Sequence, residues 1–208
     1  RLADPNTSIS ARSILSGLPV QEDIVREISD HFEYIPVQQQ IELLPLLTSM
    51  AHPAALPRVL YTAEFGRTVD LQKAAITAMA QIPCDKDSVR FLTKMVLAMH
   101  AELSNVARAS LVRSPGATVN AAIIDGLDSP DTPLRLLYIS IAAERRLTET
   151  CGKLLTMAES KSQAVRIASL DALVILAAER EYGPLLALIA ETPRSERALN
   201  VRAIRNAG

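Results

Sequence analysis

Histidine and cysteine, the residue types that most often do chemistry, are few in this chain and lie far apart. The histidines are His31, His52 and His100, and the cysteines are Cys84 and Cys151. A protein metal site needs three or four ligands close together, and a nucleophilic thiol or hydroxyl needs a base beside it. The cysteines form no CxxC pair, and none of the histidines is part of a ligand pattern. We therefore expect surface histidines, no catalytic residue, no metal site and no cofactor.

The composition favours helices and argues against nucleic acid as a partner. Of the 208 residues 49% are hydrophobic but only 3% are aromatic, and the seven glycines offer few hairpin turns. The net charge is −1, and neither half of the chain has the basic excess that binding to a phosphate backbone needs. The longest apolar run is far below the roughly 18 residues of a membrane span. We expect an all-α protein with no membrane insertion.

Two interleaved series of apolar segments repeat about every 31 residues. Each segment places apolar residues at helical spacing, which predicts one face of an amphipathic helix. The first series starts at Ile9, Gln38, Leu71, Val106, Leu134, Val165 and Glu196, and the second at Ile24, Leu56, Val89, Val119, Cys151 and Tyr182. Turn signals separate them at His52-Pro53, Gly66, Ile82-Pro83, Ser114-Pro115-Gly116, Asp128-Ser129-Pro130 and Thr192-Pro193. The pattern predicts about six and a half helical hairpins, each of which must stack on its neighbours to bury its apolar face.

The repeats resemble the HEAT family of armadillo-like helical solenoids. The segment Ala164-Val-Arg-Ile-Ala-Ser-Leu-Asp-Ala-Leu173 is similar to the second helix of a HEAT repeat. The stretch from Ala107 to Ala122 is similar to HEAT arrays of bacterial secreted multidomain proteins. The resemblance implies one domain over residues 1–208, a right-handed α-α superhelix, from a longer protein. It also favours a soluble, periplasmic or secreted setting over the cytoplasm.

Some proteins with HEAT-like architecture are enzymes, and most kinds carry residues that can be recognised in the sequence. Deoxyhypusine hydroxylases use repeated His-Glu pairs to bind iron, and no histidine of this chain is followed by Glu. DNA glycosylases of similar architecture need a basic groove and aromatic residues. Phycobilin lyases leave little trace and stay open as the alternative function, a lyase-type enzyme or enzyme accessory acting on a bound prosthetic group. The preferred interpretation is a protein–protein interaction scaffold that is not an enzyme.

Family resemblance also implies roles for individual positions. HEAT repeats carry an arginine at one position of the second helix. In this chain that position holds Arg135, Arg166 and Arg197, but in the earlier repeats it holds Gln39, Gln72 and Ala107. Asp131 is the one well-placed acid, so a ladder of Asp–Arg pairs between repeats is expected to be partial. We expect these arginines to be structural.

The scaffold hypothesis places a partner-binding surface on the concave side of the solenoid. Positions +2 and +6 of the first-series helices point away from their apolar face and should line this groove. The predicted partner-binding residues are Lys73, Arg108, Val112, Leu136, Ile167 and Asp171. An apolar centre at Leu136 and Ile167 with a polar rim is typical of a protein-binding patch. We expect a protein or peptide partner, and self-association or continuation of the chain through the open end at Ala198–Ile204, since a solenoid needs polar caps.

Overall fold

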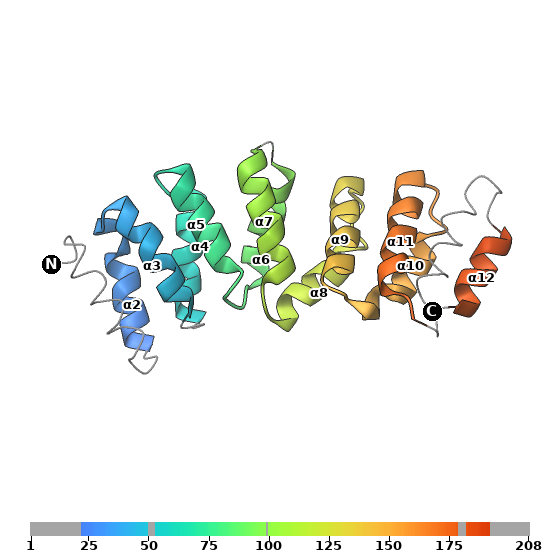
Figure 1. Cartoon of the computed structure of the whole chain (residues 1–208), viewed down its shortest axis with the longest axis horizontal. Coiled ribbons are helices and arrows are strands. Elements are labelled where there is room, and N and C mark those ends of the chain that lie inside the picture. The colour runs from blue at the N-terminus through green and yellow to red at the C-terminus, as the bar shows by residue number, and fades with distance from the viewer. Residues whose placement is uncertain (1–21, 50–52, 99, 179–181, 192–208) are drawn as a thin grey trace. The chain divides into compact units, whose positions relative to one another are not determined.

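All regular structure that the computed structural model describes is helical. It describes residues 22–49, 53–98, 100–178 and 182–191. The described helices pack in neighbouring pairs, as in an α solenoid, and the prediction of an all-α fold is confirmed (Figure 1). The chain divides into two compact units at Gly116, and each is considered by itself. None of the described helices is long and apolar enough to cross a membrane.

The first unit holds the described helices α2 to α7 and two short 3-10 helices. Their bounds are α2 Glu22–His31, η1 Phe32–Tyr34, α3 Val37–Ser49, η2 Pro53–Ala55, α4 Leu56–Phe65, α5 Val69–Met79, α6 Lys86–Leu97 and α7 Ala101–Arg113. Helix α4 pairs with α5 and α6 with α7, while α3, α5 and α7 pack on one another in succession. The first-series helices therefore form a layer of their own, with a core that includes Leu44, Ile76, Met79 and Leu111.

The second unit repeats the same scheme. Its helices are α8 Ala117–Gly126, α9 Thr132–Glu144, η3 Thr148–Thr150, α10 Cys151–Met157, α11 Gln163–Leu176 and α12 Tyr182–Glu191. Helix α8 packs against α9, α10 against α11, and α11 against α9. Buried side chains of these helices, among them Ile139, Leu154, Val165 and Leu173, form one continuous core.

Local signals in the sequence start and end these helices. The side chains of Thr68 and Asp85 accept hydrogen bonds from the main-chain N–H of Leu71 and Ser88, as helix N-caps do. Proline stands in the first turn of α4 and of α9, where its missing N–H costs nothing. Gly116, between α7 and α8, has a φ of 109°, a conformation that residues with a side chain rarely adopt.

The predicted repeat agrees with the described helices. Every predicted segment start that falls on described residues lies in a helix, from Ile24 in α2 to Tyr182 in α12. The predicted starts at Ile9 and Glu196, the turn at Thr192-Pro193 and the open end at Ala198–Ile204 lie outside the described residues.

Candidate functional site

The two histidines that the structure describes are exposed, and both cysteines are buried. His31 and His100 are exposed, and His52 lies outside the described residues. Cys151 is 2% exposed and belongs to the core of the second unit, as predicted from its position in the repeat. Among the described residues no three His, Cys, Asp or Glu side chains lie close enough to hold a metal ion.

Cys84 follows Pro83 in a turn, yet the residue is buried, with 3% of its surface exposed. Its Sγ lies 3.6 Å from the carbonyl oxygen of Met79 and 3.7 Å from Oγ of Ser114. The turn folds inward because the Oγ of Ser114 also donates to the Met79 oxygen, at 3.1 Å. A turn that closes on the end of the preceding helix buries its small residues.

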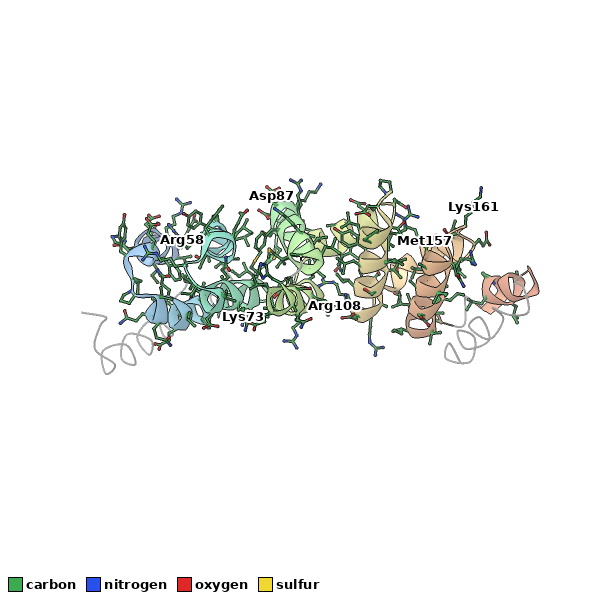
Figure 2. The ribbon with its side chains drawn as sticks, turned by 90° about the horizontal axis from the view of Figure 1, so that it is seen from above. Arg58, Lys73, Asp87, Arg108, Met157 and Lys161 are labelled. Carbon is green, nitrogen blue, oxygen red and sulfur yellow. The ribbon has the colours of Figure 1, made fainter. Side chains whose placement is uncertain are left out.

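Three of the predicted partner-binding residues lie in the first unit. Lys73 is on α5, and Arg108 and Val112 are on α7, which packs directly against α5. All three are half-buried. The Nζ of Lys73 donates to Oε2 of Glu102 at 2.9 Å, so it joins the two helices. Figure 2 places Lys73 and Arg108 on the same side of this unit, opposite Arg58 and Asp87.

The other three predicted residues lie in the second unit. Leu136 on α9 is half-buried and packs against the core of this unit. Ile167 on α11 is half-buried, and Asp171 one turn further along is exposed. The structure thus places each set on neighbouring, directly packed helices, and the partner-binding surface stays a prediction.

The arginines of the repeat are structural where the structure describes them. Arg135 donates from Nε to the carbonyl oxygen of Ser129 at 2.8 Å, and Arg166 from Nη1 to that of Ser160 at 3.0 Å. Each bond ties the first turns of a first-series helix to the turn before it. Arg197 lies outside the described residues.

A cleft of about 120 Å³ opens on the other side of the first unit, over α4. We call it the arginine–aromatic cleft. It is lined by Phe32, Glu33, Gln40, Arg58, Tyr61, Thr62, Phe65, Gly66, Arg67 and Leu71. It gathers two guanidinium groups, one carboxylate and two exposed aromatic rings.

Helix α4 presents the central side chains of this cleft. Arg58, Tyr61 and Phe65 are three and four residues apart, so they lie on one face of the helix. The guanidinium carbon of Arg58 lies 5.6 Å from the centre of the Tyr61 ring, within cation–π range. The rings of Tyr61 and Phe65 are 5.1 Å apart and tilted by 46°. They remain 52% and 61% exposed, so they have surface to offer a ligand.

Glu33 faces Arg58 from the short helix η1. Its Oε2 lies 3.6 Å from Nη1 of Arg58, whose side chain is only 20% exposed. The buried side chain of Gln40, which is 3% exposed, holds η1 in position. The Nε2 of Gln40 donates to the carbonyl oxygens of Phe32 and Ile35, at 2.8 and 2.9 Å. One buried amide therefore holds the turn that carries the carboxylate.

Sequence reasoning missed this cleft because it searched only the first-series helices for a binding face. A signal was present nonetheless. Four of the seven aromatic residues, Phe32, Tyr34, Tyr61 and Phe65, fall within residues 32–65. Two of them follow Arg58 at helical spacing, which places an arginine and two rings on one face.

Comparison with known proteins identifies a similar structure but no family. No family model matches the chain, and no curated protein matches its sequence. Human deoxyhypusine hydroxylase, solved in complex with glycerol, is similar over the whole of this chain and 92% of its own, with a TM-score of 0.45 and 15% sequence identity. The resemblance to the HEAT family stays a prediction.

This comparison corrects the predicted function. The sequence favoured a protein–protein interaction scaffold that is not an enzyme, with a phycobilin-lyase-like role as the alternative, but the similar structure is that of an enzyme, a hydroxylase. We retain neither interpretation. The physical reason is that stacked helical pairs define an architecture, whereas function depends on the side chains placed on it. At this level of similarity the hydroxylase activity is not carried over to this chain.

Proposed function

We propose that this protein binds a small planar carboxylate, a single aromatic ring bearing one carboxyl group, in the arginine–aromatic cleft. The observation that carries the proposal is the joint presence of two guanidinium groups and two exposed rings around one cleft of ring size. Its volume, about 120 Å³, is close to the roughly 150 Å³ of a protein cavity that accommodates benzene.

The two arginines supply the recognition of the carboxylate. A guanidinium presents N–H donors in a planar fork that matches the two carboxylate oxygens. Arg58 is already oriented by the Tyr61 ring and by Glu33, so little side-chain freedom is lost when it binds an anion. Arg67 is exposed at the corner between α4 and α5 and brings the second positive charge.

The aromatic pair supplies the contact with the ring of the ligand. Aromatic rings prefer offset or edge-to-face arrangements, and Tyr61 and Phe65, tilted by 46° to one another, both line the cleft. The Oγ1 of Thr62 donates to the carbonyl oxygen of Arg58 at 2.8 Å, so this hydroxyl is already bonded within α4. The ligand enters a preformed surface.

Glu33 competes with a ligand carboxylate for Arg58. Its Oε2 lies 3.6 Å from Nη1 of Arg58, and a ligand carboxylate must share or replace that contact. Glu33→Gln removes the competing charge, so we expect tighter binding, by about threefold, because a partly exposed ion pair contributes up to about 1 kcal/mol. Arg67→Gln removes an attractive charge and should weaken binding by a similar factor.

The proposal is tested by titrating the isotope-labelled protein with benzoate and following main-chain amide shifts. A ligand of nine non-hydrogen atoms is expected to bind with Kd on the order of a millimolar. Benzoate should shift amides within residues 58–67, and the neutral benzamide should bind far more weakly. Arg90→Gln is the matched control, since Arg90 is an exposed arginine on α6 of the same unit. Equal binding of benzoate and benzamide, or an equal loss in both arginine variants, would refute the proposal.

A further inference from the structure

A second cleft of about 710 Å³ lies where α5 begins, beside the start of α7. Asp70 and Glu102, each in the first turn of its helix, contribute two carboxylates. Val69, Met95 and Leu103 contribute an apolar wall. We call it the α5–α7 cleft. Its volume lies in the range of roughly 300–1,000 Å³ found for ligand pockets.

We propose that the α5–α7 cleft binds an organic cation with an apolar tail, an alkylammonium ion. The lining combines two carboxylates with aliphatic side chains, which suits a molecule that is charged at one end and apolar along its length. The flexible thioether side chain of Met95 adapts easily to an alkyl chain, and Val69 is 51% exposed, so part of the apolar wall is open to a ligand.

The charge state of the cleft supports cation binding. Both carboxylates lie in the first turns of their helices, and a helix N-terminus carries partial positive charge that stabilises anionic side chains. The hydrogen bond and the positive charge of Lys73 lower the pKa of Glu102 below its usual value. Glu102 therefore presents an ionised carboxylate at neutral pH.

Lys73 shows that one of these carboxylates already binds an ammonium group. Its Nζ lies 2.9 Å from Oε2 of Glu102, with the Glu102 side chain 71% exposed. An alkylammonium ligand offers the same chemistry and competes with Lys73 for this oxygen, while the second oxygen and Asp70 complete its surroundings. Lys73 thus competes with an alkylammonium ligand for Glu102, and the effect of removing Lys73 on ligand affinity can be measured.

The competition gives two variants with opposite expected effects. Lys73→Met keeps the aliphatic stem but removes the charge, and should tighten the binding of hexylammonium about threefold. Asp70→Asn combined with Glu102→Gln removes both carboxylates, and should weaken it about tenfold. All three side chains lie at or near the surface, and urea unfolding of each variant verifies that the fold is kept.

The experiment is an amide-shift titration of the labelled protein with hexylammonium chloride, with neutral hexan-1-ol as the ligand control. Shifts should gather at residues 69–73 and 100–103. Matched control variants are Asp87→Asn, in the first turn of α6, and Asp128→Asn, which breaks the Lys153–Asp128 pair at 2.6 Å. Hexan-1-ol binding as well as hexylammonium, weaker binding by Lys73→Met, or equal losses in the control variants would each overturn the proposal. Benzoate binding is read from other residues, so the two proposals can fail separately.

Discussion

Replacing Gln40 by methionine tests how the arginine–aromatic cleft is held together. Methionine is close to glutamine in length but offers no N–H, so the change removes donors without opening a large cavity. The main-chain oxygens of Phe32 and Ile35 would lose their partner at 2.8 and 2.9 Å. These two residues flank Glu33, so the substitution acts directly on the turn that positions the carboxylate.

The magnitude follows from the burial of the two acceptors. The bond to Phe32 is buried, but the Phe32 oxygen keeps the bond from the main-chain N–H of Ile35 at 3.3 Å, so the loss there is about 0.5–1.5 kcal/mol. The bond to Ile35 is only partly buried, so water replaces part of it and the loss is about 0.5–1 kcal/mol. Gln40→Met should therefore lower the free energy of unfolding by about 1–2.5 kcal/mol, which corresponds to roughly 2–10 °C in Tm for a chain of this size.

Urea and thermal unfolding measured by circular dichroism are suitable assays. Gln38→Met is the matched control, because Gln38 is exposed on the same helix and should change stability by less than about 0.5 kcal/mol. Gln40→Glu should destabilise more than methionine at neutral pH, since a carboxylate would face two carbonyl oxygens, and should recover in acid as its protonated form donates one bond. A loss below about 0.5 kcal/mol for Gln40→Met would refute this account of the turn.

Three further predictions concern other parts of the chain. Gly126→Ala should destabilise by about 1–3 kcal/mol in urea unfolding, because the new Cβ would lie 2.3 Å from the Tyr138 ring; a gain, as expected for alanine in an unobstructed helix, would contradict this. Arg146→Gly should raise the free energy of unfolding by about 0.5–1 kcal/mol, and Tm with it, because Arg146 has a φ of 57° just after α9. A lower Tm would mean that contacts of the arginine side chain stabilise the fold by more than its backbone conformation costs. The Lys73–Glu102 pair lowers the pKa of Glu102 and raises that of Lys73; its stabilisation should thus be lost in acid as Glu102 protonates and in strong base as Lys73 deprotonates, so that wild type and Lys73→Met converge in stability at low pH.

The helical order of the chain could be predicted because it depends on local and periodic signals. Apolar residues at helical spacing identify the buried face of each helix, and glycine or proline marks the turns at Gly66 and at residues 114–116. These signals act within a few residues and are therefore visible in one sequence. The pairing of consecutive helices follows, because a short hairpin buries its apolar face only against its neighbours.

Of the candidate sites only the face of α4 with Arg58, Tyr61 and Phe65 could be predicted, because the rest depends on contacts between separate helices. Arg58 meets Glu33 only after η1 has been set by Gln40, and Lys73 meets Glu102 across two repeats. No spacing rule links residues 33 and 58 or 73 and 102. The burial of Cys84 has the same origin, since it arises from the way its turn closes on Met79 and Ser114.

At one position of the repeat, glutamine stands in place of arginine and still donates a hydrogen bond to a main-chain oxygen. Gln72 occupies the position of Arg135 and Arg166, and the sequence indicates a break in the repeat there. In the structure the Nε2 of Gln72 donates to the main-chain oxygen of Glu64 at 3.2 Å, at the end of the preceding helix. The arginines donate to the main-chain oxygens of the turns that precede their own helices.

Ala107, at the same position of α7, has no side-chain donor, so a donor is not required in every repeat. In α5, α9 and α11 the residue at this position supplies a donor of sufficient reach, which meets a need of the last carbonyl groups of a helix and of those of a tight turn, since they lack partners within the main chain. A neutral amide meets that need as a guanidinium does, with a weaker bond. Regular packing of α3, α5 and α7 in the first unit therefore requires no arginine. Arg58 and Arg67 lie outside this position of the repeat, and they are the arginines to which we assign anion binding.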